Sequence, residues 1–532
     1  MYLATLMSVK ILNFAKNIAT MRRLCLYLFI AVMPMTVLAD DLTSGLTIYI
    51  PAEKECFDWA LNYGGNDGLT SREDYNPEAI PTSSFLTYDN CKRGDQCLEV
   101  GGGDSNNGTL KVKNNTTSSG TFFMMRIIPA FGTVKISVDY GRKTAATRTI
   151  SNNPYYYCFK YDVKTDLSIT SVVKDMDNYN FYVDDIFLYQ RTTDKTAIEK
   201  ASRIIVYAPS GITNAQIAEL QEIVAHNSNL TSIDLNSVKA SEKFSLSPAN
   251  PNCLMFCAAD ILSNDHNVVL SSSTSTFLND IINSYSCADL KIEDGYPFDA
   301  MYGFTAAKAS YNRTFTTGTG TSEYYCSVCL PFALTTLPSD VEAYRFDSCA
   351  NNTLTFAEAK TMEAAVPYII STTVAQPFIS LENVTVPGTT PRIAWKHRNG
   401  DNLNVLKEER KTLFHGTFTL LSDQRSSDSQ AIYGWQGGNV VSVGSGKDDA
   451  VSFSPFRAYF TMDKASGTAS PSLRVGGSLS GIREVTTAEA DKPLPLYTTD
   501  GVKAGVMRPS EVAGSDLPAG VYIIGGKKVT VH

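Results

Sequence analysis

Charge of either sign, histidine and long apolar runs are all scarce in this chain. Charged residues make up 19% of its 532 residues, and acidic residues outnumber basic ones by 54 to 46. This balance excludes the basic footprint of a nucleic-acid-binding protein, and without a long run of Lys and Arg nothing indicates an anionic membrane surface as partner. The hydrophobic fraction of 43% excludes a wholly disordered chain.

Recognisable catalytic motifs are missing as well. Neither a Gly-x-Ser-x-Gly elbow nor a Walker loop occurs, and the histidines show no zinc-protease spacing. They are scattered over the chain as His226, His266, His397, His415 and His532. Asp and Glu are numerous enough that a glycosidase pair stays open, because such sites assemble from distant residues. The missing motifs favour binding over catalysis.

The start of the chain predicts export. A basic segment at residues 21–23 precedes the apolar residues 24–33, and the small-residue stretch 37–39 stands just before Asp40. This order is typical of a secretory signal peptide, so we expect residues 1–39 to be one, with translation starting at Met21. The apolar stretch is short for a membrane span, which makes an N-terminal anchor the less favoured alternative. No later segment is apolar enough to span a bilayer, so we expect an extracytoplasmic protein.

Cysteine usage fits that compartment. Of the 11 cysteines, all but Cys25 follow the predicted signal peptide, and an even number in an exported protein permits disulfides. The closest plausible pair is Cys91 with Cys97, which would staple a short turn. Cys326 and Cys329 have redox or zinc spacing, but they lie in strand-like sequence, where their side chains would point to opposite faces. We therefore expect structural cysteines or disulfides there.

Apolar and polar residues alternate with a period of two along most of the chain. Residues 134–140 are an example, and such a strand buries one face and wets the other. Residues 40–195 contain several of these segments between polar turns, which is typical of a β-sandwich. Residues 301–476 are β-rich again. Near the end, Gly525 and Gly526 separate two strand-like segments and predict a hairpin.

One segment differs from this pattern. Residues 204–207 are strand-like, and Thr213 with Gln216 predicts a capped helix start. The next apolar residues share one helical face and are Ile217, Leu220, Ile223 and Val224. Residues 230–235 then follow as a strand. This helix-then-strand unit looks like one turn of a leucine-rich repeat, which must pack on its neighbours because one turn cannot bury its own faces.

Several short motifs together resemble modules of secreted Bacteroidota proteins. The first resembles a jelly-roll module that is similar to galactose-binding-like carbohydrate-binding domains, and it rests on residues 55–58, 64–68, 97–101 and 183–186. A second β-module of the same group is matched by residues 329–332, 341–344 and 365–369. The ending, residues 517–523 and 527–529, resembles a C-terminal sorting-type domain as in type IX secretion cargo, although residues 530–532 depart from its usual basic or apolar end.

Pattern and resemblance together predict a mainly β, multidomain fold. We expect a jelly-roll-like β-sandwich at residues 40–195, a small α/β leucine-rich-repeat-like insert at 196–300 and β-rich domains at 301–476. A linker and a small C-terminal β domain occupy 477–532. A chain of this length has room for about three or four domains, which agrees with this division.

The resemblance also implies a structural Ca²⁺ site. In similar jelly rolls an acidic residue of the first strand lies against an acidic residue of the last strand. The matching residues of this chain are Glu55 and Asp184. Asp184 shares strand parity with Ile186 and Leu188 and would face the sandwich interior, where a carboxylate needs a partner or a metal. The alternative is a solvated edge with turn carboxylates and no ion.

Candidate ligand contacts lie in the same predicted domain. Trp59, Tyr155 and Tyr157 would offer aromatic faces to a carbohydrate, although aromatic residues of a sandwich more often fill its core. The tripeptide Arg93, Gly94 and Asp95 lies between Cys91 and Cys97, and a loop held by that disulfide would display it as integrin ligands display theirs.

The function predicted from these features is non-enzymatic binding or adhesion by a secreted or cell-surface protein. Its ligand would be a glycan or a host or matrix surface, and secretion machinery would be a partner through the C-terminal domain. Two alternatives stay open. The chain could belong to an extracellular hydrolase, either as an accessory domain protein or as a cryptic hydrolase itself. It could instead be a structural component of the envelope.

Overall fold

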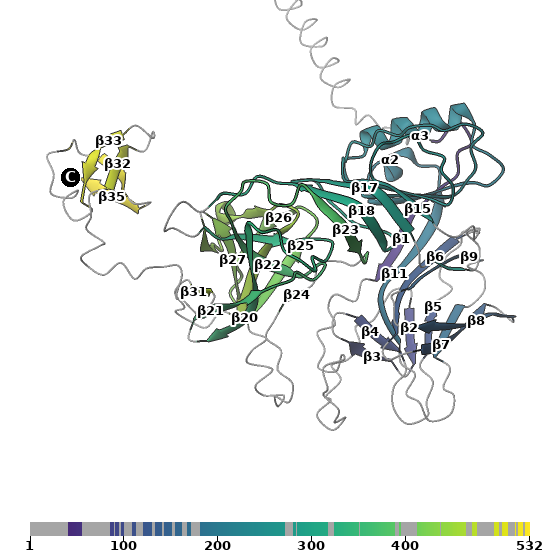
Figure 1. Cartoon of the computed structure of the whole chain (residues 1–532), viewed down its shortest axis with the longest axis horizontal. Coiled ribbons are helices and arrows are strands. Elements are labelled where there is room, and N and C mark those ends of the chain that lie inside the picture. Colours follow the sequence, from purple (N-terminus) through teal and green to yellow (C-terminus); the bar gives the residue numbers. More distant parts are fainter. Residues whose placement is uncertain are drawn as a thin grey trace, which may run out of the picture.

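A computed structural model describes most of the chain from Asp41 onward. The described residues are 41–55, 86–89, 91–94, 97–100, 109–112, 121–129, 133–140, 143–151, 155–161, 167–171, 181–271, 280–282, 285–317, 324–350, 352–388, 393–394, 412–436, 438–463, 471–475, 494–498, 503–508, 517, 520–524 and 527–531. The predicted signal peptide and Trp59 lie outside them. Within this part the fold is mainly β in several separate sheets, as the alternation predicts (Figure 1).

The largest sheet has 14 strands and runs through most of the molecule. In spatial order its main path is β16 (Asp280–Ile282), β9 (Tyr155–Tyr161), β6 (Thr121–Pro129), β11 (Phe181–Thr192), β1 (Ile48–Glu55), β12 (Arg203–Ala208), β13 (Ser232–Val238), β14 (Leu254–Cys257), β15 (Val268–Ser271), β17 (Tyr285–Glu293), β18 (Phe304–Asn312) and β23 (Leu381–Val386). The hairpin of β3 (Cys91–Gly94) and β4 (Cys97–Val100) joins it beside β11.

A second sheet lies against the first part of this large sheet (Figure 1). Its order is β2 (Leu86–Asp89), β5 (Thr109–Val112), β10 (Leu167–Ser171), β7 (Thr133–Tyr140) and β8 (Lys143–Ser151). Leu86 and Leu110 are buried in it, and Ile186 and Leu188 are buried in β11. The arrangement is consistent with the sandwich that we expected for the first domain.

The middle of the large sheet is parallel. β12, β13, β14 and β15 pair in parallel order, and β17 pairs in parallel with β18. The short helix α2 (Lys195–Ile198) precedes β12, and α3 (Asn214–His226) connects β12 to β13. The predicted cap of α3 is confirmed, because Thr213 and Gln216 form a reciprocal capping box. The sheet continues through the predicted boundaries near residues 195 and 300.

Each face of these parallel strands is buried. Ile204, Val206 and Met255 pack on the side of α3, whose Leu220 and Ile223 belong to the same core. Ile205, Leu254 and Phe256 pack on the other side, in a core that extends to Val328 and Phe456. Strands covered on both faces carry nearly continuous apolar residues, which explains the run at residues 204–207.

Buried asparagines hold the turns before these strands. The Asn227 side chain donates to the carbonyls of Ile198 and Ala201, and Asn250 donates to those of Leu230 and Pro297. Asn252 and Asn267 make equivalent bonds in the following turns. Because an amide offers donors and an acceptor at once, each asparagine satisfies turn backbone that would otherwise be buried without partners.

A second sandwich follows. One sheet is ordered β19 (Cys326–Cys329), β22 (Pro367–Thr372), β20 (Val341–Ala350), β21 (Thr353–Ala359) and β31 (Ser472–Val475). The facing sheet is β24 (Ile393–Ala394), β25 (Thr412–Thr417), β30 (Arg457–Asp463), β27 (Gln430–Gln436) and β28 (Asn439–Val443). Phe346 and Phe356 of the first meet Phe414 and Phe460 of the second in one core.

Small elements complete the description. β26 (Leu421–Gln424) pairs with β29 (Val451–Phe453), and a 3₁₀ turn, η2, covers Lys447–Asp449. A four-stranded sheet near the C-terminus is ordered β33 (Lys503–Met507), β32 (Leu494–Thr498), β34 (Gly520–Ile524) and β35 (Lys527–Val531). The predicted hairpin is confirmed, since β34 pairs with β35. No helix in the described part of the chain is long and apolar enough to cross a membrane.

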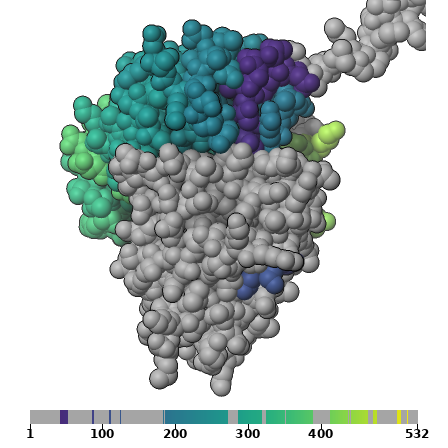
Figure 2. Space-filling view, turned by 90° about the vertical axis from the view of Figure 1, so that its right-hand side faces the viewer, coloured from purple at the N-terminus to yellow at the C-terminus, as the bar shows by residue number. Residues whose placement is uncertain are grey.

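The N-terminal segment lies on the surface beside the parallel strands (Figure 2). Thr43 and Ser44 donate backbone and hydroxyl hydrogen bonds to the carboxylate of Glu219 on α3. Leu42 donates its backbone N–H to the carbonyl of Thr193, at 2.9 Å. The residues that follow the expected cleavage site are thereby tied to the fold.

Candidate functional site

A cleft of the described residues, called the main cleft below, lies where the turns of the parallel strands face the second sandwich. Its volume is about 770 Å³, within the range of ligand sites, about 300–1,000 Å³. One wall comes from the turns before β12 and β13 and from the loop between β17 and β18. The other comes from the end of β25 and the start of β26. The lining residues are Phe187, Ser202, Arg203, Ser228, Asn229, Thr231, Gly295, Tyr296, Pro297, Phe298, Asp299, Gly416, Thr417, Phe418, Thr419, Leu420, Leu421 and Tyr459.

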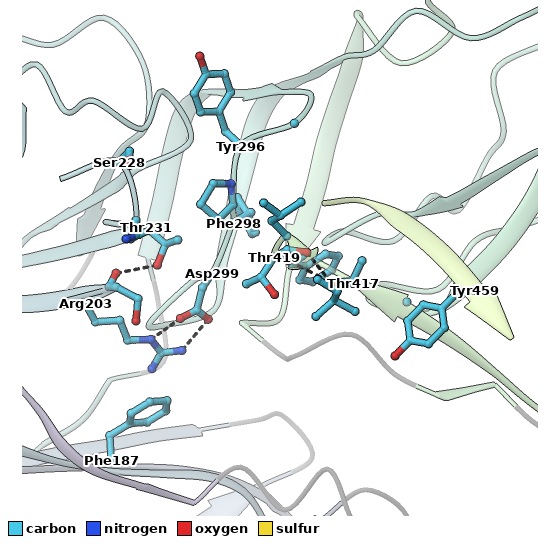
Figure 3. Close-up of a pocket in the computed structure, with 18 residues that line it drawn as sticks. Phe187, Arg203, Ser228, Thr231, Tyr296, Phe298, Asp299, Thr417, Thr419 and Tyr459 are labelled. Atoms are coloured by element: carbon cyan, nitrogen blue, oxygen red, sulfur yellow. Dashed lines mark hydrogen bonds and ion pairs between the residues drawn. The ribbon is translucent and has the colours of Figure 1, made fainter. Parts of the chain in front are cut away.

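A charged pair forms the base of the cleft. Arg203, which is 3% exposed, binds both carboxylate oxygens of Asp299, through Nε and through Nη2 at 2.6 Å. The guanidinium carbon lies 3.9 Å from the centre of the Phe187 ring, a cation–π contact. Figure 3 shows Arg203 between Phe187 and Asp299. Since the two charges neutralise each other, the pair adds no net charge to the cleft.

Asparagines position the loop that carries the exposed tyrosine. The Asn252 side chain donates to the carbonyls of Glu293, at 2.9 Å, and Tyr296, at 3.0 Å. Its oxygen accepts the backbone N–H of Glu293 at 2.6 Å. Tyr296 is 43% exposed and stands at the rim of the cleft (Figure 3). A buried amide therefore fixes the backbone while the aromatic ring stays open to solvent.

The opposite wall combines aromatic packing with hydroxyl groups. Phe298 donates its backbone N–H to the carbonyl of Phe418 at 2.9 Å, and the two rings meet edge to face at 6.1 Å. The Thr417 hydroxyl donates to the carbonyl of Thr419 at 2.7 Å. Leu420 is 59% exposed. Hydroxyl groups and apolar surface thus alternate along this wall.

Tyr459 reaches the cleft from the second sandwich (Figure 3). Its ring is stacked between His415, at 4.9 Å and 13°, and Phe453, at 4.7 Å and 10°. Burial lowers the pKa of His415 to about 4, so the imidazole is neutral at pH 7. Burial also raises the pKa of Tyr459. The stack is therefore uncharged and rigid, and it offers no acid or base to the cleft.

The candidates of the first domain lie elsewhere. Glu55 ends β1 and its backbone is paired with Ile186, two residues from Asp184 on the neighbouring strand. The backbone therefore brings the predicted calcium residues onto adjacent strands, while their side chains lie outside the description and the site stays a prediction. Within the described residues, no group of three or more His, Cys, Asp or Glu is placed to hold a metal ion.

The predicted disulfide lies on the hairpin of β3 and β4. Its register pairs Cys91 with Val100 and Cys97 with Gly94. Three strand steps, about 10 Å, separate the two cysteines along the hairpin, which is more than a disulfide spans between Cα atoms. The bond stays a prediction, and it would require this hairpin to change register.

The other predicted contacts are placed only in part. Arg93 and Gly94 end β3, and Asp95 lies outside the described residues. Tyr155 and Tyr157 belong to β9, next to β6, and the direction of their rings lies outside the description.

Six cysteines of the described part are free thiols. They are Cys253, Cys257, Cys287, Cys326, Cys329 and Cys349. Burial raises the pKa of each thiol, for example that of Cys287 to about 12. Cys326 and Cys329 are both buried in β19, which agrees with structural cysteines and not with a redox pair, whose thiolate needs a lowered pKa.

Sequence reasoning did not find the main cleft. Its residues come from turns at 202–203, 228–231, 295–299 and 416–421, and no shared spacing connects them. Two features of the sequence indicate turns at these positions, although neither indicates a cleft. They are the Asn-rich segment after α3 and the turn-forming residues Gly295 and Pro297.

Comparison with known proteins adds little. No protein-family model matches the chain, and no curated protein matches it. Among solved structures, a family 29 carbohydrate-binding module from Piromyces equi is 12% identical, with a TM-score of 0.16, over 20% of this chain and 81% of that one. A family 36 carbohydrate-binding module solved with calcium and xylotriose is 13% identical, with a TM-score of 0.14, over 22% of this chain and 94% of that one.

A third structure, the Agl-KA catalytic domain, is 12% identical with a TM-score of 0.15, over 49% of this chain and 48% of that one. TM-scores of this size carry no argument about fold or function. The function has to be inferred from the cleft itself.

Proposed function

We propose that the chain is an exported, non-enzymatic binding protein that takes an uncharged glycan in the main cleft. The observation that carries the proposal is the lining, in which exposed Tyr296 and Leu420 occur together with the exposed polar side chains of Ser228, Asn229 and Thr419. The only charges in this lining, Arg203 and Asp299, are paired with each other. Such a surface suits a ligand with apolar faces and hydroxyl groups and selects against ions.

The physical reason is complementarity. A ligand site needs apolar or aromatic surface for affinity and a few placed polar groups for orientation. A sugar ring has an apolar C–H face and a polar rim of hydroxyls. The Tyr296 ring would cover the first, and Ser228, Asn229 and Thr419, which are exposed, would meet the second.

The same lining argues against glycoside hydrolysis in this cleft. A hydrolase of the common type needs two carboxyl groups, about 5–10 Å apart. Asp299 is the one carboxylate among the described residues that line the cleft, and Arg203 occupies both of its oxygens. Binding without turnover is therefore the function that this geometry supports best.

The remaining parts of the proposal concern location. We infer that residues 1–39 direct export and that the sheet at residues 494–531 contacts secretion machinery, which would place the protein in the medium or on the outer cell surface. Adhesion to a host or matrix surface would follow from a glycan on that surface. A structural Ca²⁺ between Glu55 and Asp184 belongs to the same proposal.

The test is an array of neutral oligosaccharides probed with the mature chain and with two variants. Tyr296→Ala removes the exposed ring and should weaken binding roughly tenfold, about 1.4 kcal/mol. The matched control is Ile379→Ala, because Ile379 is similarly exposed, at 49%, and lies outside the lining. Binding that is equal in both variants, or absent throughout the array, would contradict the proposal.

A further inference from the structure

A second, smaller pocket lies beside the second sandwich and shares no lining residue with the main cleft. Its volume is about 160 Å³. It opens between the segment after β18, the start of β19, the turn from β27 to β28 and the start of β30. The lining residues are Arg313, Thr314, Phe315, Thr316, Tyr324, Tyr325, Cys326, Ser327, Trp435, Gly438 and Arg457.

One of its two arginines is fully partnered. Arg457 binds both oxygens of Asp294 through Nη1 and Nη2, each at 2.8 Å. The Tyr311 hydroxyl donates to the same carboxylate at 2.7 Å. These bonds hold the pKa of Asp294 below its usual value although burial acts to raise it. The Asp294 carboxylate beside the pocket is therefore used by Arg457.

The other arginine lacks an anionic partner. Arg313 is 9% exposed, and its Nη1 donates to the carbonyl of Ser327 at 2.8 Å. Its guanidinium carbon lies 4.2 Å from the centre of the Phe315 ring. No carboxylate of the described chain forms an ion pair with it. Since arginine keeps its charge, two guanidinium groups face one carboxylate here, which leaves one buried positive charge unbalanced.

Aromatic rings form part of the remaining walls. The Trp435 indole donates to the carbonyl of Tyr325 at 2.8 Å, which fixes its ring. Gly438 has φ +78°, and a Cβ there would come within 3.3 Å of the Tyr324 ring. A side chain at this position would be strained at this φ and would require the tyrosine ring to shift, because the turn and the tyrosine approach closely. A planar group would fit between such walls with one end at the guanidinium.

We propose that this pocket binds a small carboxylate, either a free acid of the size of acetate or the carboxylate of an acidic sugar. A buried cation without a counter-charge is costly, and an anion in the pocket removes that cost. A carboxylate matches the planar fork of Arg313 and brings a negative charge that the described residues do not place against this guanidinium. The proposal is independent of the glycan cleft, because it uses other residues.

The experiment is titration calorimetry of the mature chain with acetate, glucuronate and inorganic phosphate. Arg313→Gln keeps the shape of the side chain and removes its charge, so it should weaken binding of the carboxylates about 10-fold or more. Arg313→Lys should restore part of the affinity. The matched control is Arg345→Gln, because Arg345 is 53% exposed and pairs with Glu363 on the surface. Thermal unfolding of each variant checks its folding.

A second variant, Tyr324→Ala, distinguishes the two sources of the carboxylate. It also tests the pocket if Arg313→Gln does not fold. Tyr324→Ala removes one wall without touching the charge. For an acidic sugar, glucuronate should bind more tightly than acetate and lose affinity in Tyr324→Ala. For a free acid, both probes should bind alike. No carboxylate binding to the unmodified chain, binding of phosphate alone, or equal behaviour of Arg313→Gln and Arg345→Gln would overturn the proposal.

Discussion

Arg203 and Asp299 form a two-point ion pair although 96 residues separate them along the chain. Arg203 begins β12, and Asp299 lies in the loop between β17 and β18. The backbone carbonyl of Asp299 also accepts the Ser232 hydroxyl at the start of β13. The pair therefore joins the loop to two parallel strands at the base of the main cleft.

Removing the carboxylate of this pair should be more costly than removing the cation. Asp299→Ala removes the carboxylate that binds the Arg203 guanidinium, whose side chain is 4% exposed, and should lower the free energy of unfolding by about 3–5 kcal/mol. Arg203→Ala should cost less because the Asp299 side chain is 27% exposed and can be hydrated. Urea unfolding measures both. Lys243→Ala breaks an exposed pair as control and should cost less than about 1 kcal/mol. Equal costs for Asp299→Ala and Lys243→Ala would refute this.

The buried carboxyl of Asp234 should make stability fall with rising pH. Burial raises its pKa to about 6, although hydrogen bonds from Tyr302 and Asn236 act to lower it. Between its ordinary pKa of 3.8 and about 6, the folded state binds more protons than the unfolded state, so this group contributes most below pH 4. The contribution should decrease by about 3 kcal/mol up to pH 7.

Unfolding free energies at several pH values test this against Asp234→Asn. The variant should lack the decrease between pH 4 and 7 that the unmodified chain shows. The control is Asp260→Asn, because the Asp260 side chain is 60% exposed and its change should leave the pH profile as it is. Identical profiles for the unmodified chain and Asp234→Asn would contradict the assignment.

Asn252 should matter both for stability and for the cleft. Asn252→Ala leaves the carbonyls of Glu293 and Tyr296 and the N–H of Glu293 without their partner, and should lower the unfolding free energy by about 3 kcal/mol. Because the same loop carries Tyr296, oligosaccharide binding should weaken too. Asn312→Ala removes two exposed hydrogen bonds, to Glu293 and from Gln376, and should change stability by less than about 0.5 kcal/mol. A variant with full stability and full binding would show that the amide does not position the loop.

The Glu219 carboxylate should hold the N-terminal segment in a pH-dependent way. Burial acts to raise its pKa, yet the hydrogen bonds from Ser44 and Thr43 hold the pKa below its usual value. The stabilisation is then present above the unfolded pKa, about 4.3, and is lost as the pH falls through the lower folded value. Glu219→Gln should therefore reduce hydrogen-exchange protection of the amides of Thr43 and Ser44 at pH 7.

The control for this change is Glu222→Gln on the same helix. Glu222 is 53% exposed and pairs with Lys195 at 2.9 Å, so its loss should leave the two amides protected. In the unmodified chain their protection should fall as the pH drops through the lowered pKa of Glu219, and in Glu219→Gln no such step should occur. Equal protection in the two variants would contradict the proposed role of Glu219.

The local pattern was sufficient for many individual elements. The alternation at residues 134–140 predicts β7, and Thr213 with Gln216 predicts the start of α3, because both depend on neighbours in the sequence. The two glycines before Lys527 predict the hairpin of β34 and β35 for the same reason. Composition and alternation likewise establish a mainly β fold, since they fix which faces of a strand can be buried.

Strand order and the sites were decided by tertiary structure. Nothing in the local pattern of β17 and β18 predicts that they pair in parallel and carry the sheet past residue 300. β11 is buried on both faces, with Ile186 and Phe187 both under 5% exposed, so alternation cannot indicate its partners. The cleft joins Arg203 to Asp299 and Tyr296 to Leu420 through pairings between distant segments. The alternation of apolar and polar residues shows which face of a strand is buried, but it does not show which strands pair with it. A site formed between paired segments can therefore be identified only in the folded chain.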